Sequence, residues 1–162
     1  MKSLDWLMAK VASGLHFVAT LMLIGIVVVN MINVVGRYGL SKPLDTAEEL
    51  MIFMLTIAVF FCLPLCTRED EHIRMNLLRE HASGWVRSLW DLLLELTHLG
   101  VMLAVVYIGA PTIAKLFAWG QASTAAKIPM WIVHSVIPLA FGLAGVILFI
   151  KIVQLIRNWG HP

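Results

Sequence analysis

The chain has 162 residues, of which 60% are hydrophobic and only 14% are charged, and its formal net charge is +2 at pH 7. Soluble domains are about 45–50% apolar and about 25% charged, so this composition excludes an ordinary soluble enzyme and a disordered chain. The small net charge also provides no broad basic surface for nucleic acid. A folded chain of this length makes one domain, and we expect residues 1–162 to form a single membrane domain.

Four apolar runs are long enough to cross a hydrocarbon core about 30 Å thick, which takes about 20 helical residues. They cover residues 11–35, 47–66, 88–119 and 131–156. The first run is too long for a signal peptide and has no small-residue cleavage site after it, so we interpret it as a retained anchor. The sequence therefore predicts an all-α membrane protein with four transmembrane helices.

The segment between the second and third runs is predicted to contain a short amphipathic helix lying in the membrane interface, over residues 73–86. Apolar side chains recur every three or four residues from Met75 to the start of the third run, with polar ones largely between them, and are Met75, Leu78, Ala82, Trp85 and Leu89. That pattern is typical of an interfacial helix, which a tryptophan such as Trp85 would anchor. The alternative is a polar loop with a few isolated apolar residues.

Lysine and arginine side chains indicate the orientation of membrane helices, because they are enriched in cytoplasmic segments. Eight lie before the first run, in the middle segment or at the end of the fourth run: Lys2, Lys10, Arg68, Arg74, Arg79, Arg87, Lys151 and Arg157. Four lie on the other side: Arg37, Lys42, Lys115 and Lys127. This distribution predicts that both termini and the middle segment lie in the cytoplasm.

Charged residues at the ends of the runs have two interpretations. Glu48 and Glu49 open the second run, where carboxylates suit the positive end of a helix dipole. The alternative is a salt bridge with Arg37 at the end of the first run, or with a partner subunit. Glu95, one turn beyond Asp91 in the third run, would meet a cation on another helix, a lipid headgroup or a partner. Otherwise this part of a long helix lies at the headgroups.

Three histidines lie inside the predicted spans. His16 and His98 belong to the same half of the membrane, where a pair on facing helices would ligate haem, and His134 has no companion at its depth. We favour histidines that are hydrogen-bonded to a neighbour. Cys62 and Cys66 share one helix face and are interpreted as buried thiols, because a reducing cytoplasm disfavours a disulfide. No cofactor or metal site is predicted on this chain.

The chain also lacks several features of enzymes and transporters. It has no phosphate-binding glycine loop, no nucleophile motif and no carboxylate near the middle of a span. A four-helix exporter would be expected to carry a membrane-buried acid in its first span, and residues 11–35 contain none. The sequence therefore favours a protein that is not an enzyme and that supports another membrane protein.

Three local signatures resemble the small membrane subunit (DctQ-like) of tripartite ATP-independent periplasmic, or TRAP, transporters. The first is NVVGRY at 33–38, which leads into Glu48-Glu49, and the second is HIRMNL at 72–77. The third is GQAS at 120–123 followed by IPMW at 128–131. Because the signatures occur in the family's order and the four spans also match, the resemblance covers almost the whole chain. The chain departs from the family pattern at Thr46-Ala47, Asn76 and Thr124.

The resemblance implies a role as an accessory scaffold. A large membrane subunit (DctM-like) would carry the substrate and sodium sites and work as an elevator, and a periplasmic solute-binding protein would deliver an organic acid or similar solute. This chain would extend the fixed scaffold in the bacterial inner membrane, in contact with phospholipids and the large subunit. It would bind no cofactor and no nucleic acid. A haem-binding anchor of a redox complex and a stand-alone small exporter are the alternatives.

The resemblance also assigns residues. Arg37, Glu48 and Glu49 match family positions and are expected to form ion pairs near the outer surface. His72 and Arg74 match the second signature and are expected to contact headgroups or the large subunit. The further expected structural or partner contacts are Trp85, Glu95 and Trp131.

Overall fold

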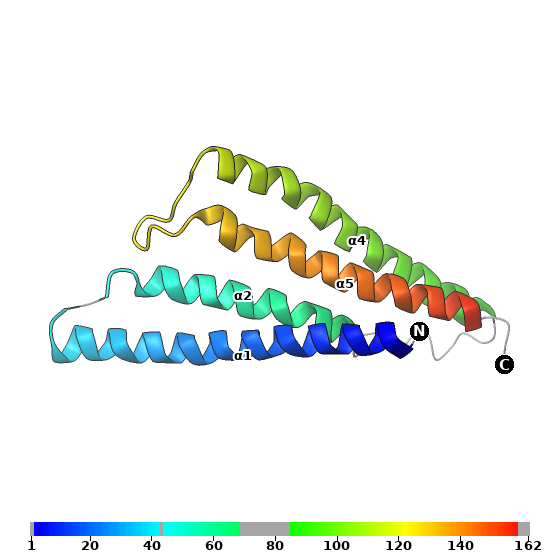
Figure 1. Cartoon of the computed structure of the whole chain (residues 1–162), viewed down its shortest axis with the longest axis horizontal. Coiled ribbons are helices and arrows are strands. Elements are labelled where there is room, and N and C mark those ends of the chain that lie inside the picture. Colours follow the sequence, from blue (N-terminus) through cyan, green and yellow to red (C-terminus); the bar gives the residue numbers. More distant parts are fainter. Residues whose placement is uncertain (1, 43, 69–84, 159–162) are drawn as a thin grey trace.

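A computed structural model describes residues 2–42, 44–68 and 85–158, and the regular elements in these ranges are helices. They are α1 (Lys2–Gly39), α2 (Ala47–Arg68), α4 (Trp85–Ala118) and α5 (Met130–Asn158) (Figure 1). Each contains a stretch long and apolar enough to cross a membrane: Ala9–Gly39, Ala47–Arg68, Leu89–Ala118 and Met130–Gln154. The prediction of an all-α protein with four helices able to span a membrane is confirmed.

The helices extend beyond the apolar runs from which they were predicted. Helix α1 runs from Lys2 to Gly39, past both ends of residues 11–35. Apolarity marks only the part of a helix inside hydrocarbon, whereas its backbone hydrogen bonds continue into the headgroup region. Helix α4 begins at Trp85, so the last two residues of the predicted interfacial helix belong to α4 instead. The other residues of the predicted interfacial helix, 73–84, lie outside the described residues.

The helices form a row in the order α1, α2, α5, α4 (Figure 1). Helix α1 packs on α2, α2 on α5, and α5 on α4, which leaves α1 and α4 as the two edges. We call the end of the row with residues 40–42, 44–46 and 119–129 the turn end. The opposite end, where α1 begins and α5 finishes, is the termini end.

The best-packed part of the row surrounds α5. Of the residues in the most apolar stretch of α5, 33% are buried. The corresponding share is 6% in each of the edge helices, α1 and α4. Its core consists of Met102 from α4 and Ala144, Leu148 and Ile152 from α5, and Leu63 of α2 packs against them. Ala144 is 0% exposed, because its small side chain lets the neighbouring helix approach closely.

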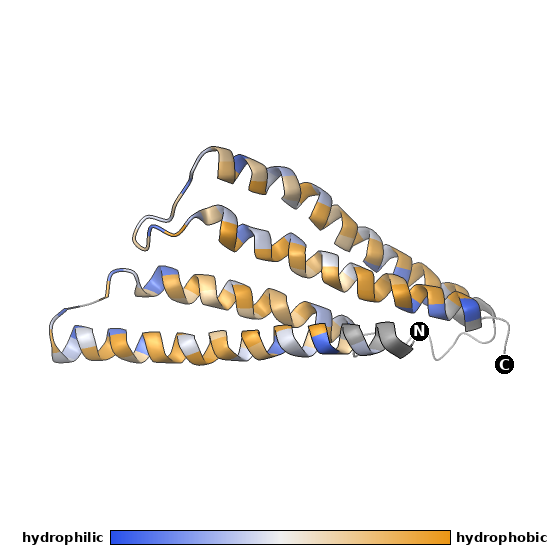
Figure 2. Ribbon diagram, viewed as in Figure 1, coloured by the Kyte–Doolittle hydropathy of each residue, from blue (hydrophilic) through white to orange (hydrophobic). Residues whose placement is uncertain are grey.

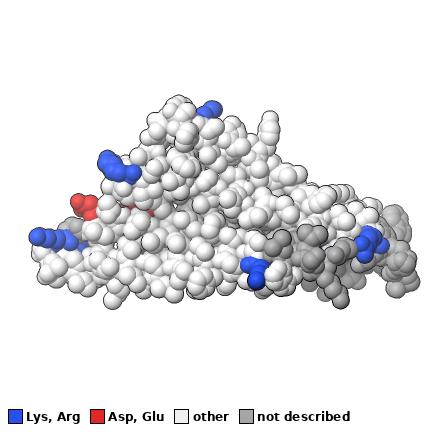
Figure 3. Space-filling model, viewed as in Figure 1, with Lys and Arg blue, Asp and Glu red and all other residues white. Residues whose placement is uncertain are grey.

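Hydrophobic residues predominate along the helices of the row (Figure 2), and many of the large ones are exposed. Val27 of α1 is 62% exposed and Ile108 of α4 is 65% exposed, although both are large aliphatic side chains. On the face shown in Figure 3 most of the surface is uncharged, and acidic side chains appear only at the turn end. Such a surface suits lipid chains or the helices of another subunit.

Candidate functional site

The first signature builds the turn between α1 and α2. Asn33, which is only 9% exposed, accepts the backbone N–H of Leu44 on its Oδ1 atom at 3.0 Å. The carbonyl oxygen of Gly36 accepts the N–H of Lys42 at 2.9 Å. A Cβ atom on Gly36 would lie 2.7 Å from the carbonyl oxygen of Lys42, so a side chain here would push the turn away. The signature thus folds Lys42 and Leu44 back against the last turns of α1.

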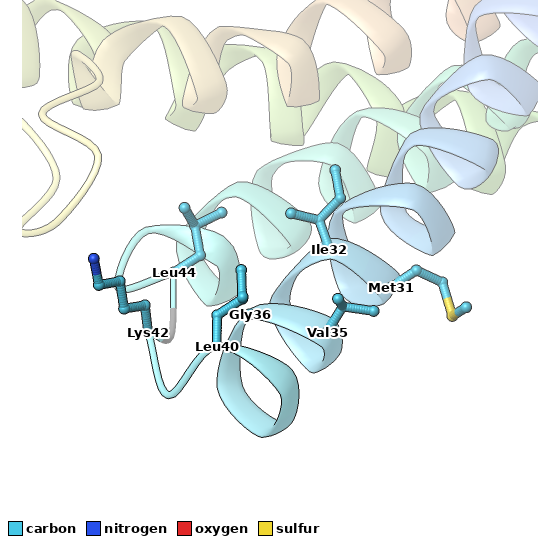
Figure 4. Close-up of a pocket in the computed structure, with 7 residues that line it drawn as sticks. All are labelled: Met31, Ile32, Val35, Gly36, Leu40, Lys42 and Leu44. Carbon is cyan, nitrogen blue, oxygen red and sulfur yellow. The ribbon is translucent and has the colours of Figure 1, made fainter.

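A shallow apolar groove of about 450 Å³ lies between this turn and α1 (Figure 4). Lys42 is its one charged lining residue, and the others are Met31, Ile32, Val35, Gly36, Leu40 and Leu44. Solute sites combine an apolar wall with several polar groups that converge on the ligand. The described lining is mainly apolar and comes from the folded-back turn and the end of α1.

The first residues of the third signature terminate α4. Gly120 has a φ of 58°, in the left-handed region that glycine adopts without strain. Its N–H donates to the carbonyl oxygen of Phe117 at 3.1 Å, and that of Gln121 donates to Leu116 at 3.3 Å. This pair of bonds is the Schellman motif that terminates helices. It turns the chain sharply from α4 into the α4–α5 loop.

The α4–α5 loop is a small hairpin closed by its own polar groups. Ser123, 8% exposed, donates its backbone N–H to the carbonyl oxygen of Ile128 at 2.9 Å. Ile128 returns a bond from its N–H to the Ser123 hydroxyl oxygen at 3.1 Å. The N–H of Met130 donates to the carbonyl oxygen of Gln121 at 2.9 Å and closes the base. The tip of the hairpin, residues 124–127, is thereby held in one place.

Glu49, in the first turn of α2, fastens that tip. Its Oε1 atom accepts the backbone N–H groups of Thr124 at 3.1 Å and Ala125 at 3.0 Å. Its Oε2 atom accepts those of Ala125 at 3.1 Å and Ala126 at 2.8 Å. Three successive N–H groups around one anion form a nest, and bonds to a charged acceptor are stronger than neutral ones. We call this arrangement the Glu49 clamp.

A second polar contact joins α2 to α5 at the termini end. The Nζ atom of Lys151 in α5 donates to the carbonyl oxygen of Thr67 at 2.6 Å. Thr67 is 1% exposed and lies in the last turn of α2. Carbonyl groups in the last turn receive no hydrogen bond from within the helix, and they form the negative end of the helix dipole. The Glu49 clamp and the Lys151 contact thus hold α2 to the α4–α5 pair at both ends.

We expect Lys151→Met to lower the stability of the fold by about 1–2 kcal/mol, because a buried carbonyl loses a charged donor. Lys115→Met is the matched control, since Lys115 is an exposed lysine at the end of α4. The midpoint of thermal unfolding in detergent is the measurement. Equal midpoints for the two variants would show that the Lys151 contact adds nothing to the fold.

The structure places the predicted ion-pair residues at the turn end but does not pair them. Arg37 and Glu48 are exposed, and within the described ranges no ion pair joins Arg37 to Glu48 or Glu49. The carboxylate of Glu49 binds the α4–α5 loop instead. The alternative that Arg37 or Glu48 pairs with another subunit stays a prediction.

The other predicted contacts are scattered. Trp131 packs edge-on against Phe117 of α4, with ring centroids 5.6 Å apart and planes at 81°, which joins α4 and α5 at the turn end. Glu95 is half-buried in α4, and Trp85 is the first residue of that helix. The predictions for His72 and Arg74 fall outside the described residues.

The histidines do not come together. His16 is exposed on α1 and His98 lies on α4, so the pair considered for haem occupies opposite edges of the row (Figure 1). His134 forms a hydrogen bond through Nδ1 with the carbonyl oxygen of Met130 at 2.9 Å, the local bonding favoured for it. In the part of the chain that the structure describes, no three His, Cys, Asp or Glu side chains gather as a metal site would require.

Sequence reasoning missed the side-chain roles of Asn33, Ser123 and Lys151. Asn33 and Ser123 are polar residues beside short connections, and both belong to the signatures. This position in the sequence is the signal that could have indicated their roles. In the sequence, the charge of Lys151 bears only on the orientation of the helices. Its partner, a backbone carbonyl far away in the sequence, leaves no mark on the residue pattern.

Comparison with known proteins identifies the family. Residues 26–158 match the family described as tripartite ATP-independent periplasmic transporters, DctQ component. The ectoine TRAP transporter small permease protein TeaB of Halomonas elongata is 26% identical over 115 residues, which cover 70% of this chain. The matched stretch covers 59% of TeaB, so the chain spans about three-fifths of that relative's length. With most of its helices inside the match, the chain belongs to the DctQ family of small TRAP transporter subunits.

Proposed function

We propose that this chain is the scaffold subunit of a sodium-coupled TRAP transporter in the bacterial inner membrane. It joins a large membrane subunit, which binds solute and sodium and works as an elevator. A periplasmic binding protein delivers the solute, an organic acid or similar small molecule. Both termini lie in the cytoplasm, in agreement with the distribution of lysine and arginine, so the turn end faces the periplasm.

The row of helices is the observation that carries this proposal. A solute pathway needs polar groups around an enclosed space, usually at the interface of several helices. In the described part of this chain, α1 and α4 are edges, so the helices form an open row and not a closed bundle (Figure 1). Many large hydrophobic side chains of this row are exposed, as expected for a body that lies against lipid and a larger subunit.

The two polar contacts support a scaffold that keeps its shape. The α1–α2 pair and the α4–α5 pair meet along α2 and α5. Sliding of one pair past the other would break the Glu49 clamp at one end and the Lys151 contact at the other. An elevator that moves through the membrane needs a neighbour that resists such sliding.

The solute is proposed only as a class. The name of TeaB assigns ectoine to the transporter of that protein. On the present proposal the solute touches the binding protein and the large subunit, so residues of this chain do not select it.

Co-expression with the large subunit tests the assignment. We expect the two chains to purify together through an affinity tag on either one and to elute as one species in size-exclusion chromatography. The large subunit expressed alone is expected to aggregate or to be degraded. A large subunit that is equally stable alone, with this chain eluting separately, would contradict the assignment.

A further inference from the structure

The exposed surface of α1 includes two stripes of different chemistry. One stripe contains residues spaced three or four apart, all of them exposed: Ser13, His16, Thr20, Leu23, Val27, Asn30, Val34 and Arg37. Residues with this spacing lie on one side of a helix. Every exposed polar side chain between residues 11 and 35 belongs to this stripe, which we call the polar stripe.

The neighbouring stripe has the same spacing and is entirely apolar. It consists of Phe17, Leu21, Ile24, Val28, Met31 and Val35, all exposed, and we call it the apolar stripe. All of these side chains are exposed, although Met31 and Val35 at the end of the apolar stripe also line the groove beside the turn between α1 and α2. The two stripes suit different neighbours, because only the apolar stripe presents hydrophobic side chains to lipid along its whole length.

Two groups in the polar stripe require a hydrogen-bonding neighbour. The Thr20 hydroxyl is satisfied within α1, since it donates to the carbonyl oxygen of His16 at 3.0 Å. The side chains of Asn30 and His16 have no hydrogen-bond partner in the ranges that the structure describes. Polar side chains exposed to hydrocarbon are costly and normally face a protein partner. The polar stripe is therefore suited to another membrane helix.

The other edge of the row is better suited to lipid. The exposed Thr97 and Thr112 of α4 donate their hydroxyls to their own helix, at 2.8 Å to Leu93 and 3.1 Å to Ile108. Tyr107 is the exposed side chain of α4 whose hydroxyl has no partner in the described part of the chain. A single tyrosine can direct its hydroxyl toward the interface, whereas Asn30 is too short to do so.

We propose that the polar stripe of α1 docks against a membrane helix of the large subunit, an inference that rests on the proposed function. That helix carries a hydrogen-bonding side chain at the depth of Asn30 and an acidic side chain near Arg37. A second copy of this chain fits less well. Copies in one membrane share an orientation, so the same stripes would place two Arg37 side chains opposite each other, and like charges repel.

Site-specific photo-crosslinking tests the proposal, because α1 offers three matched pairs of adjacent positions. Leu23, Val27 and Val34 lie in the polar stripe, and Ile24, Val28 and Val35 lie beside them in the apolar stripe. All six side chains are between 43% and 62% exposed. With p-benzoylphenylalanine at each position of the co-expressed complex, we expect capture of the large subunit from Leu23, Val27 and Val34 only.

A second measurement addresses the hydrogen bond at Asn30. We expect Asn30→Leu to weaken the complex about threefold to tenfold, Asn30→Gln to retain most of the affinity, and Val28→Leu to have no effect. An equal affinity for Asn30→Leu and the unmodified chain would overturn this part of the proposal.

The outcomes separate the docking surface from the function. A complex that purifies intact, but crosslinks from the apolar stripe or from neither stripe, would overturn the proposed surface and leave the function standing. Capture of a second copy of this chain from the polar stripe would also overturn it. Failure of the two subunits to purify together would overturn the function itself, and the docking surface with it.

Discussion

Replacement of Glu49 by glutamine is expected to release the α4–α5 loop from α2. The carboxylate accepts the N–H groups of Thr124, Ala125 and Ala126, and an amide of the same shape has no charge and turns an NH₂ group toward these donors. We expect the three backbone amides to exchange with solvent at least about tenfold faster, because exchange follows local opening. Hydrogen–deuterium exchange followed by mass spectrometry of residues 120–130 measures this directly.

Glu48 supplies the control for this experiment. It is the preceding residue, carries the same side chain and is exposed. Glu48→Gln is therefore expected to leave exchange in the α4–α5 loop unchanged. Equal exchange rates in the two variants would mean that the Glu49 clamp does not hold the loop. Both glutamates suit the start of a helix, so the comparison also separates the clamp from a general dipole effect.

Replacement of Gly36 by alanine is expected to destabilise the fold by roughly 1–3 kcal/mol, the usual cost of forcing an extra group into a tight contact. The added Cβ would lie 2.7 Å from the carbonyl oxygen of Lys42, and a backbone atom cannot rotate away as a side chain can. The turn between α1 and α2 would have to open, which would also strain the bond from Leu44 to Asn33. Unfolding by SDS titration in mixed micelles gives the free-energy change.

Gly14 is the matched control in the same helix. A Cβ there would meet nothing within 4 Å, so Gly14→Ala is expected to stabilise α1 by roughly 0.5–1 kcal/mol through its helix propensity. If Gly14→Ala lowered the stability as much as Gly36→Ala, both effects would reflect a sensitivity of α1 to any substitution. The close approach at Lys42 would then have no special role.

The helices were predictable because length and apolarity alone identify a segment that can cross a membrane. The spatial order was not, since the four apolar runs are nearly equal in composition. Nothing in the sequence states that α5 lies between α2 and α4, or that His16 and His98 occupy opposite edges. That order depends on details such as Ala144 and Leu148 packing against Met102, which the hydrophobic pattern does not distinguish from lipid-facing positions.

The turn end was predictable in part. The sequence identified Glu49 as a structural carboxylate at the start of a helix, but its partners are backbone N–H groups 75 to 77 residues further on. Residue spacing reveals contacts within a helix and not contacts between distant loops, so Arg37 was the natural candidate partner. The signatures around Gly36 and Ser123 are visible in the sequence as patterns. Their physical reasons, a close backbone approach and a closed hairpin, are visible only in the folded structure.

Reconstituted uptake tests the central claim, that this chain supports transport without carrying out transport itself. Proteoliposomes would contain this chain, the large subunit, or both, with the periplasmic binding protein and its radiolabelled solute outside and an inward sodium gradient. We predict sodium-dependent uptake only when both membrane chains are present. Uptake by this chain alone, or undiminished uptake by the large subunit without it, would contradict the account.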